Sequence, residues 1–134
     1  MRRPFVAGNW KMNLDLASAR ALVGELRVKI GASPLIDVAV CPPAVYLFPV
    51  RKVLDDSSIR LGAQNMSEHH FGAFTGGICA GMLKEFSVRY VILGHSERRQ
   101  YQKESDALIA KKALAAHGAA LKPIVCVGET LTER

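Results

Sequence analysis

Residues 90–101, with the sequence YVILGHSERRQY, decide the fold class. The apolar run 90–93 is typical of a strand buried in a parallel sheet, and His95, Ser96 and Glu97 follow it within four residues. Catalytic groups of α/β enzymes lie at the carboxyl ends of parallel strands, where the chain turns outward and the next helix presents its positive amino end. This stretch therefore predicts an α/β fold with an imidazole, a hydroxyl and a carboxylate at one strand end.

A second apolar run near the start of the chain ends in the same way. Residues 5–7 are apolar, and Gly8 allows a tight exit towards Asn9 and Lys11. Two predicted strand ends therefore carry polar side chains that are suited to binding or polarising a substrate.

Apolar runs and helical patterns alternate along the whole chain, without an internal repeat or a low-complexity linker. Four continuous apolar runs are predicted to be strands buried on both faces: 5–7, 38–40, 90–93 and 124–127. A shorter run at 60–63 makes a fifth candidate strand. Four segments have helical patterns. The first has an apolar stripe of Ala19, Leu22, Val23, Leu26 and Ile30, the second covers residues 45–54 after two prolines, and the third covers residues 80–86. The fourth is a helix capped by Ser105 and stopped by Gly118, with Ile109, Ala113 and Ala116 on its buried side. The alternation predicts a parallel sheet with right-handed crossovers, either doubly wound or barrel-like.

Specific motifs choose between these two architectures. The chain resembles the triosephosphate isomerase family over essentially its whole length, in the stretches 5–13 (FVAGNWKMN), 62–65 (GAQN), 72–76 (GAFTG), 90–101 and 122–130 (KPIVCVGET). The resemblance implies a partial (β/α)8 barrel with about five parallel strands and flanking helices. Residues 1–134 would then form a single domain, the N-terminal portion of a barrel whose usual length is ~250 residues.

Five strands cannot close an eight-stranded barrel. The open edges of such a sheet expose unpaired backbone groups and an apolar face. A complementary chain, a second copy of this chain or a rearranged, more compact fold would each cover them.

The resemblance also implies roles for the polar residues at the two strand ends. His95 would be the neutral electrophile that polarises the carbonyl of a triose phosphate, and Lys11 would supply positive charge to the phosphate and the developing enediolate. Asn9 would donate a hydrogen bond to a substrate oxygen. Glu97 matches a family residue that is usually paired with the lysine, and Ser96 matches one that holds the catalytic base at rest.

The family's glutamate base follows its sixth strand, whereas this sequence ends at Arg134, just beyond the fifth. The leading hypothesis is therefore a triosephosphate isomerase of glycolysis and gluconeogenesis that needs a complementary C-terminal half and has little activity alone. The alternative is a non-catalytic half-barrel module that forms homo-oligomers through its open sheet edges. A third hypothesis is a basic protein that binds phosphate-bearing ligands or nucleic acid, and scattered basic residues without interleaved aromatic residues argue against nucleic acid.

The connection 64–81 is unusually long and carries two phenylalanines among its glycines. By resemblance it reaches across to a second subunit, so that Phe74 and Thr75 would lie in an interface. The family commonly has a glutamate where this chain has Gly77, and this difference removes the usual partner of the arginine that matches Arg98.

Composition restricts the remaining possibilities. The formal net charge of +6 suits a phosphate ester, and three cysteines, an odd number, suit reduced thiols in a cytoplasmic protein. No run approaches the ~20 apolar residues that cross a bilayer, and no signal pattern precedes the first strand, so no membrane contact is expected. Adjacent His69 and His70 face different ways and lack further ligands, so no metal site is predicted. No dinucleotide or P-loop motif is present, so no cofactor is expected.

Overall fold

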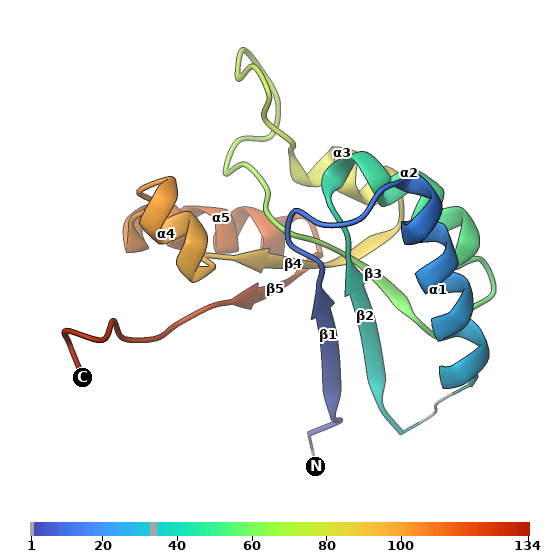
Figure 1. Ribbon diagram of the computed structural model, residues 1–134. Coiled ribbons are helices and arrows are strands. Elements are labelled where there is room, and N and C mark those ends of the chain that lie inside the picture. The colour runs from blue at the N-terminus through green and yellow to red at the C-terminus, as the bar shows by residue number, and fades with distance from the viewer. Residues whose placement is uncertain (1, 33–34) are drawn as a thin grey trace.

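The computed structural model describes residues 2–32 and 35–134, and five parallel strands form its single sheet within these ranges. Their order in the sheet is the order along the chain (Figure 1). The strands are β1 (Phe5–Asn9), β2 (Asp37–Cys41), β3 (Arg60–Ala63), β4 (Val88–Leu93) and β5 (Lys122–Val125). Because every strand pairs with its neighbour in sequence, the sheet curls in one direction, and the predicted half-barrel is confirmed.

Helices follow each of the first four strands and pack against the outer side of the curl (Figure 1). They are α1 (Leu16–Ile30), the 3-10 turn η1 (Ala44–Tyr46), α2 (Leu47–Val53), α3 (Ala80–Glu85), α4 (Ser96–Tyr101) and α5 (Asp106–Gly118). Within residues 2–32 and 35–134, no helix has both the length and the apolar character that crossing a membrane requires.

Side-chain caps fix where the two longest helices begin. Asp15 and Ser18 form a reciprocal capping box at α1, since the Ser18 N–H donates to Asp15 Oδ1 (2.8 Å) and the Asp15 N–H donates to Ser18 Oγ (3.0 Å). The predicted cap of α5 is confirmed, because Ser105 Oγ accepts the Leu108 N–H at 3.2 Å. The α5 helix ends at Gly118, as predicted, and Ala120 two residues beyond it has a φ of +60°.

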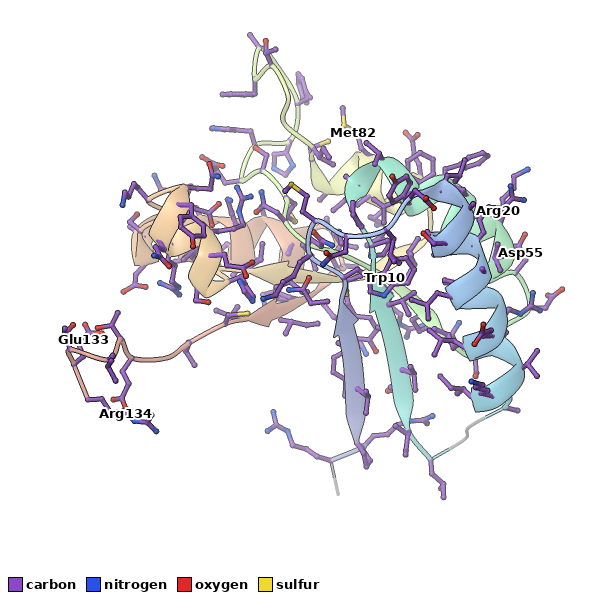
Figure 2. All side chains as sticks on the ribbon, in the orientation of Figure 1. Trp10, Arg20, Asp55, Met82, Glu133 and Arg134 are labelled. Carbon is purple, nitrogen blue, oxygen red and sulfur yellow. The ribbon has the colours of Figure 1, made fainter. Side chains whose placement is uncertain are left out.

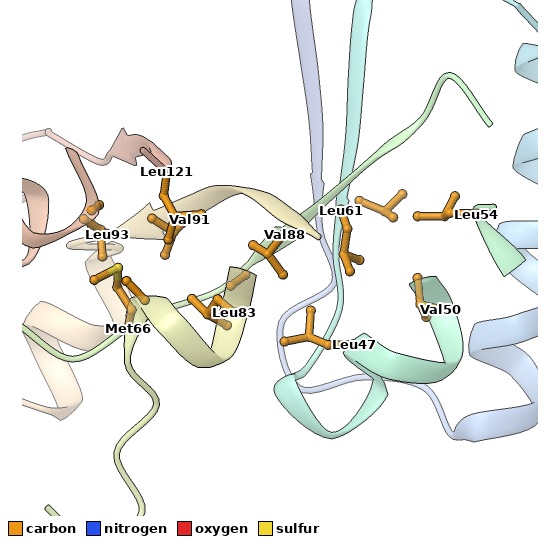
Figure 3. Close-up of a cluster of buried hydrophobic side chains, with 14 of the residues drawn as sticks. Leu47, Val50, Leu54, Leu61, Met66, Leu83, Val88, Val91, Leu93 and Leu121 are labelled. Atoms are coloured by element: carbon orange, nitrogen blue, oxygen red, sulfur yellow. The ribbon is translucent and has the colours of Figure 1, made fainter. Parts of the chain in front are cut away.

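The hydrophobic core lies between the sheet and the helices, and Figure 3 shows its largest members. In α1, Ala19 and Val23 are fully buried, while Leu26 and Ile30 pack partly against the core. Leu22 is 36% exposed, contrary to the prediction, and is not among the described residues that pack against the core. In α5, Ile109 and Ala116 are buried as predicted, whereas Ala113 packs only partly against the core.

The two outermost strands are not buried on both faces, and this part of the prediction was wrong. Phe5 and Val6 of β1 are 39% and 58% exposed, and Val125 of β5 is 43% exposed. Each of these strands has a partner on one side only. Within the described residues, no helix covers the concave face of the sheet.

The last strand begins and ends two residues earlier than the predicted range 124–127. Residues Lys122–Val125 pair with β4, and the Cys126 N–H adds one more hydrogen bond, to the Leu93 carbonyl at 2.9 Å. Pro123 lies inside this strand although it has no N–H to donate. A proline is tolerated there because one edge of β5 has no partner among the described strands.

Of the described glycines, Gly62 has the least room for a side chain. A Cβ atom at this position would lie 2.4 Å from Cys41 Sγ, which belongs to the adjacent strand β2. Overpacking of this kind typically costs ~1–3 kcal/mol. We expect Gly62→Ala to lower the free energy of unfolding by about that amount, as measured by urea denaturation, and we expect Cys41→Ala to relieve most of the loss in the double variant.

A matched control is Gly24→Ala in α1, where an added Cβ meets nothing within 4 Å. Alanine is the better helix former, so this variant should be as stable as the parent or more so. A Gly62→Ala variant whose urea midpoint equals that of the parent would contradict the predicted clash.

Candidate active site

The carboxyl ends of β1 and β4 bring together two residues that are 86 positions apart in sequence. Lys11 Nζ donates to Glu97 Oε1 at 2.7 Å, although both side chains are nearly half exposed. Trp10, labelled at the end of β1 in Figure 2, packs partly against the core. It anchors this turn, since its backbone N–H donates to the Cys41 carbonyl at 3.1 Å. The cationic and anionic groups therefore meet above the sheet.

The backbone of Lys11 is held in a conformation that non-glycine residues rarely adopt, with φ of +54°. Its N–H donates to Asn9 Oδ1 at 3.0 Å, and its carbonyl accepts from Gln64 Nε2 at 2.8 Å. The same amide of Gln64 donates to the Cys41 carbonyl at 2.9 Å. Gln64 therefore ties the ends of β1, β2 and β3 together around Lys11.

Sequence reasoning did not single out Gln64 as a site residue. The available signal was its position, because it follows the run 60–63 directly, as Asn9 follows the first apolar run. A polar side chain within two residues of an apolar run thus marked three of the five predicted strand ends.

Replacing Gln64 by glutamate places a carboxylate oxygen against two carbonyl oxygens. An unsatisfied polar group costs ~1–3 kcal/mol, and we expect Gln64→Glu to lower the free energy of unfolding at pH 7 by about that amount. Protonation restores a donor, so the deficit should shrink as the pH falls below the pKa of the new carboxyl group. Urea denaturation between pH 4 and pH 8 measures this, with the exposed Gln102→Glu as control. A deficit that stays constant with pH would disprove the role assigned to the amide.

His95 caps α4, and a hydrogen bond assigns its tautomer. Its Nδ1 accepts the Glu97 backbone N–H at 3.2 Å, so Nδ1 carries no proton and Nε2 is the ring's donor. Glu97 Oε2 lies 3.5 Å from the same nitrogen. The hydrogen bond to Nδ1 thus leaves Nε2 as the ring nitrogen that is free to donate.

Hydrogen bonding from Lys11 holds the pKa of Glu97 below its usual value. Because this pKa is depressed in the folded state, the pairing contributes to stability above the ordinary glutamate pKa. That contribution is lost as the pH falls through the folded-state value. At neutral pH Glu97 is therefore an anion that is already engaged by a cation.

Arg99 braces the turn that carries His95. Its Nε donates to the Gly94 carbonyl at 2.7 Å, its Nη2 donates to the Cys126 carbonyl at 3.0 Å, and its Nη1 pairs with Asp106. Gly94 has a φ of +66°, and a Cβ there would lie 2.8 Å from Ile109 Cδ1. The guanidinium thus joins the ends of β4 and β5, a role that sequence reasoning did not predict.

An open cavity of about 570 Å³ lies beside the imidazole. His95, Ser96 and Arg99 form one wall, and residues 126–130 form the other. Glu129 belongs to the second wall and pairs with Arg134 at 3.4 Å. Asn9 and Lys11 lie outside these walls.

Comparison with known proteins agrees with this arrangement. The family model described as triosephosphate isomerase matches residues 4–134. The chain belongs to the triosephosphate isomerase family. It is 57% identical over 134 residues to the triosephosphate isomerase of Albidiferax ferrireducens and 54% identical to that of Herminiimonas arsenicoxydans. Each match covers 100% of this chain and 54% of the relative, so the chain spans about half the length of these curated relatives.

A solved structure of the triosephosphate isomerase family has the same fold. The crystal structure of the enzyme from Bartonella henselae superimposes with a TM-score of 0.91 at 43% sequence identity. The match covers 98% of this chain and 54% of that chain. The five strands described above are therefore part of a TIM barrel.

The loop between β3 and α3, expected from the family resemblance to form an interface, projects from the body of this chain (Figure 1). Phe74 is 47% exposed and stacks on the His69 ring, with ring centroids 3.8 Å apart. Thr75 is exposed and lines a cavity of about 440 Å³ together with Arg98 and Glu104. Neither Phe74 nor Thr75 contributes to the cavity beside His95.

Arg98 has a partner within this member of the triosephosphate isomerase family despite Gly77. Its Nε lies 2.8 Å from Glu104 Oε1, which also accepts from Lys112 Nζ, and Lys112 Nζ donates to Asn65 Oδ1 at 2.9 Å. Burial raises the pKa of Glu104, but the hydrogen bonds from Lys112 and Arg98 outweigh it, so this pKa lies below its usual value. A buried network therefore joins α4 and α5 to the start of the long loop.

The cysteines of the described part of the chain form no disulfide bond. Cys41, Cys79 and Cys126 are free thiols, and burial raises the pKa of Cys41 to about 12. Among the described residues, no three His, Cys, Asp or Glu side chains lie together in a way that would hold a metal ion.

Proposed function

We propose that this chain carries the electrophilic half of a triosephosphate isomerase site, which interconverts dihydroxyacetone phosphate and glyceraldehyde 3-phosphate in glycolysis and gluconeogenesis. The observation that carries the proposal is the convergence of Lys11 from β1 with Glu97 and His95 from β4. Membership of the family supports the choice of reaction. The substrate class is a triose phosphate, and no cofactor takes part.

The reaction moves a proton between adjacent carbons through an enediolate, and each side chain has a separate task in it. The His95 Nε2–H donates to the substrate's carbonyl oxygen, because Nδ1 is already occupied as an acceptor. The Lys11 ammonium group stabilises the phosphate and the developing negative charge. Asn9 Oδ1 accepts the Lys11 N–H, which leaves the NH2 group of Asn9 to donate to a substrate oxygen.

The base that removes the carbon-bound proton comes from a complementary segment in this proposal. Glu97 is unsuited to that task because Lys11 engages it and depresses its pKa. Ser96, exposed in the cavity wall, holds the incoming base at rest. Phe74 and Thr75 contact a partner, which is either the complementary C-terminal half or a second copy, in the cytoplasm.

The test is isomerase turnover by the purified chain alone, with His95→Gln and Glu129→Gln as matched variants. General base catalysis is ordinarily worth ~10²–10⁴-fold, so the chain alone should show no more turnover than its His95→Gln variant. Turnover that His95→Gln abolishes would refute the need for a second segment. Loss in Glu129→Gln as well would identify the base within this chain.

A second candidate function is a non-catalytic module that assembles through its outer strands. The exposed apolar residues Phe5, Val6 and Val125 on β1 and β5 favour it. This module forms a defined homo-oligomer by itself, whereas a half-site that awaits its partner does not. Analytical ultracentrifugation of the purified chain separates the two, and a single oligomeric species without turnover supports the module.

A further inference from the structure

Basic side chains gather at the amino ends of β4 and β5, at the opposite edge of the sheet from the candidate site. Arg89 is the second residue of β4, and Lys122 is the first residue of β5. Lys84 lies in the last turn of α3, immediately before β4. Three cations therefore border one end of two paired strands.

Ion pairing distinguishes the amino ends of β4 and β5 from the carboxyl edge, although Arg3 pairs with Asp37 further along the same amino edge. At the carboxyl edge, Lys11, Arg98, Arg99 and Lys112 each pair with a carboxylate. Within residues 2–32 and 35–134, the ion pairs include none of Lys84, Arg89 and Lys122. The chain has 18 basic and 12 acidic residues. Part of its excess positive charge therefore lies at the amino ends of β4 and β5.

The three cations surround a depression of about 360 Å³, and no aspartate or glutamate is among the residues that line it. The neighbouring depression around Arg51 and Arg60 differs in this respect, because Asp55 and Asp56 line it. Like charges in one depression repel each other, and an anion would remove that repulsion. The depression without carboxylates is therefore the stronger candidate for an anion.

Two tight turns, at Ser87 and Ala120, contribute residues to the lining of this depression. Ser87 and Ala120 have φ of +59° and +60°, and their N–H groups close turns onto the carbonyls of Lys84 and His117, both at 2.9 Å. Ser87 Oγ accepts from Arg51 Nε at 3.2 Å, which leaves its hydroxyl hydrogen to donate. The ammonium group of Lys122 lies 5.8 Å from the centre of the Tyr90 ring.

We propose that this depression binds a small phosphate-bearing anion with two or more negative charges. The Arg89 guanidinium supplies the planar donor pair that suits phosphate oxygens, and Lys84 and Lys122 add point charges. The Ser87 hydroxyl donates a further hydrogen bond. This site uses no residue of the candidate active site and does not depend on the proposed isomerase function.

The test is a ¹H–¹⁵N NMR titration of the full chain with pyrophosphate at constant ionic strength. We expect shift changes at residues 87–89 and 120–122, and roughly tenfold weaker binding in Arg89→Gln/Lys122→Gln, since exposed charge contacts are individually weak. Lys29→Gln/Lys111→Gln removes the same charge from exposed helical positions and should leave the affinity unchanged. Lys84→Gln removes the third positive charge of the depression without changing a strand residue, and it should also weaken the binding of pyrophosphate.

Each other result overturns the proposal. Equal weakening in the two double variants would mean that net charge alone attracts the anion. Shift changes confined to the surroundings of Lys11 and His95 would place the phosphate at the candidate active site instead. Binding of a single-stranded oligonucleotide without binding of pyrophosphate would indicate a nucleic-acid surface.

Discussion

Replacing Lys11 by methionine is expected to lower isomerase kcat/KM by about 10²–10³-fold, the usual cost of removing one preorganised electrostatic group from a transition state. The substitution keeps the length of the side chain and removes the charge that lies 2.7 Å from Glu97. The assay uses a single-chain fusion of residues 1–134 to the remaining segment of the Albidiferax ferrireducens relative, to which this chain is 57% identical. The loss should appear in both kcat and KM, because the proposed function places the ammonium group against the bound phosphate and the enediolate.

The control for this experiment is Lys29→Met, which removes a lysine that pairs only with the exposed Glu25 on the same helix. Surface pairs of this kind contribute little, so turnover should be unchanged. A Lys11→Met fusion with the turnover of the parent would refute the role assigned to Lys11.

Replacing Glu104 by glutamine is expected to lower the free energy of unfolding by ~3–5 kcal/mol, because it leaves the ammonium group of Lys112 buried without a counter-charge. The side chains of Glu104 and Lys112 are only 3% and 5% exposed. The double variant Glu104→Gln/Lys112→Met buries neither charge and should recover much of the loss. Urea denaturation followed by circular dichroism measures all three free energies.

The same network predicts a pH dependence. The pKa of Glu104 is depressed in the folded state, so its contribution is fully present above the ordinary glutamate pKa and declines as the pH falls through the folded-state value. The parent should therefore lose stability on acidification more steeply than Glu104→Gln does. Parallel pH profiles for the two proteins would show that Glu104 does not contribute in this way.

The sequence predicted polar side chains at the ends of β1 and β4 because they lie within four residues of an apolar run, and the family resemblance implied their roles. It could not predict how Lys11 is held. The positive φ of Lys11 and the two hydrogen bonds from Gln64 depend on how three strand ends are placed relative to one another. The bracing of the His95 turn by Arg99 likewise depends on the approach of β5.

The fold itself followed from the alternation of apolar runs and helical patterns, and family motifs selected the barrel. An exposed apolar face at the open edges was expected, but the prediction that β1 and β5 are buried on both faces was wrong. A continuous apolar run is also found in an outer strand whose second face is covered only in a closed barrel. Within the described residues, Phe5, Val6 and Val125 lack that cover on one face. The early start of β5 was missed for a related reason, since a proline inside a strand ordinarily argues against pairing.

The most direct test of the proposed function compares isomerase turnover of the single-chain fusion with that of its His95→Gln variant. The account predicts substantial turnover of glyceraldehyde 3-phosphate by the fusion and a loss of at least about 10²-fold in the variant, since the imidazole donates to the substrate's oxygen. A correctly folded fusion whose turnover is absent, or is unaffected by the loss of His95, would contradict it.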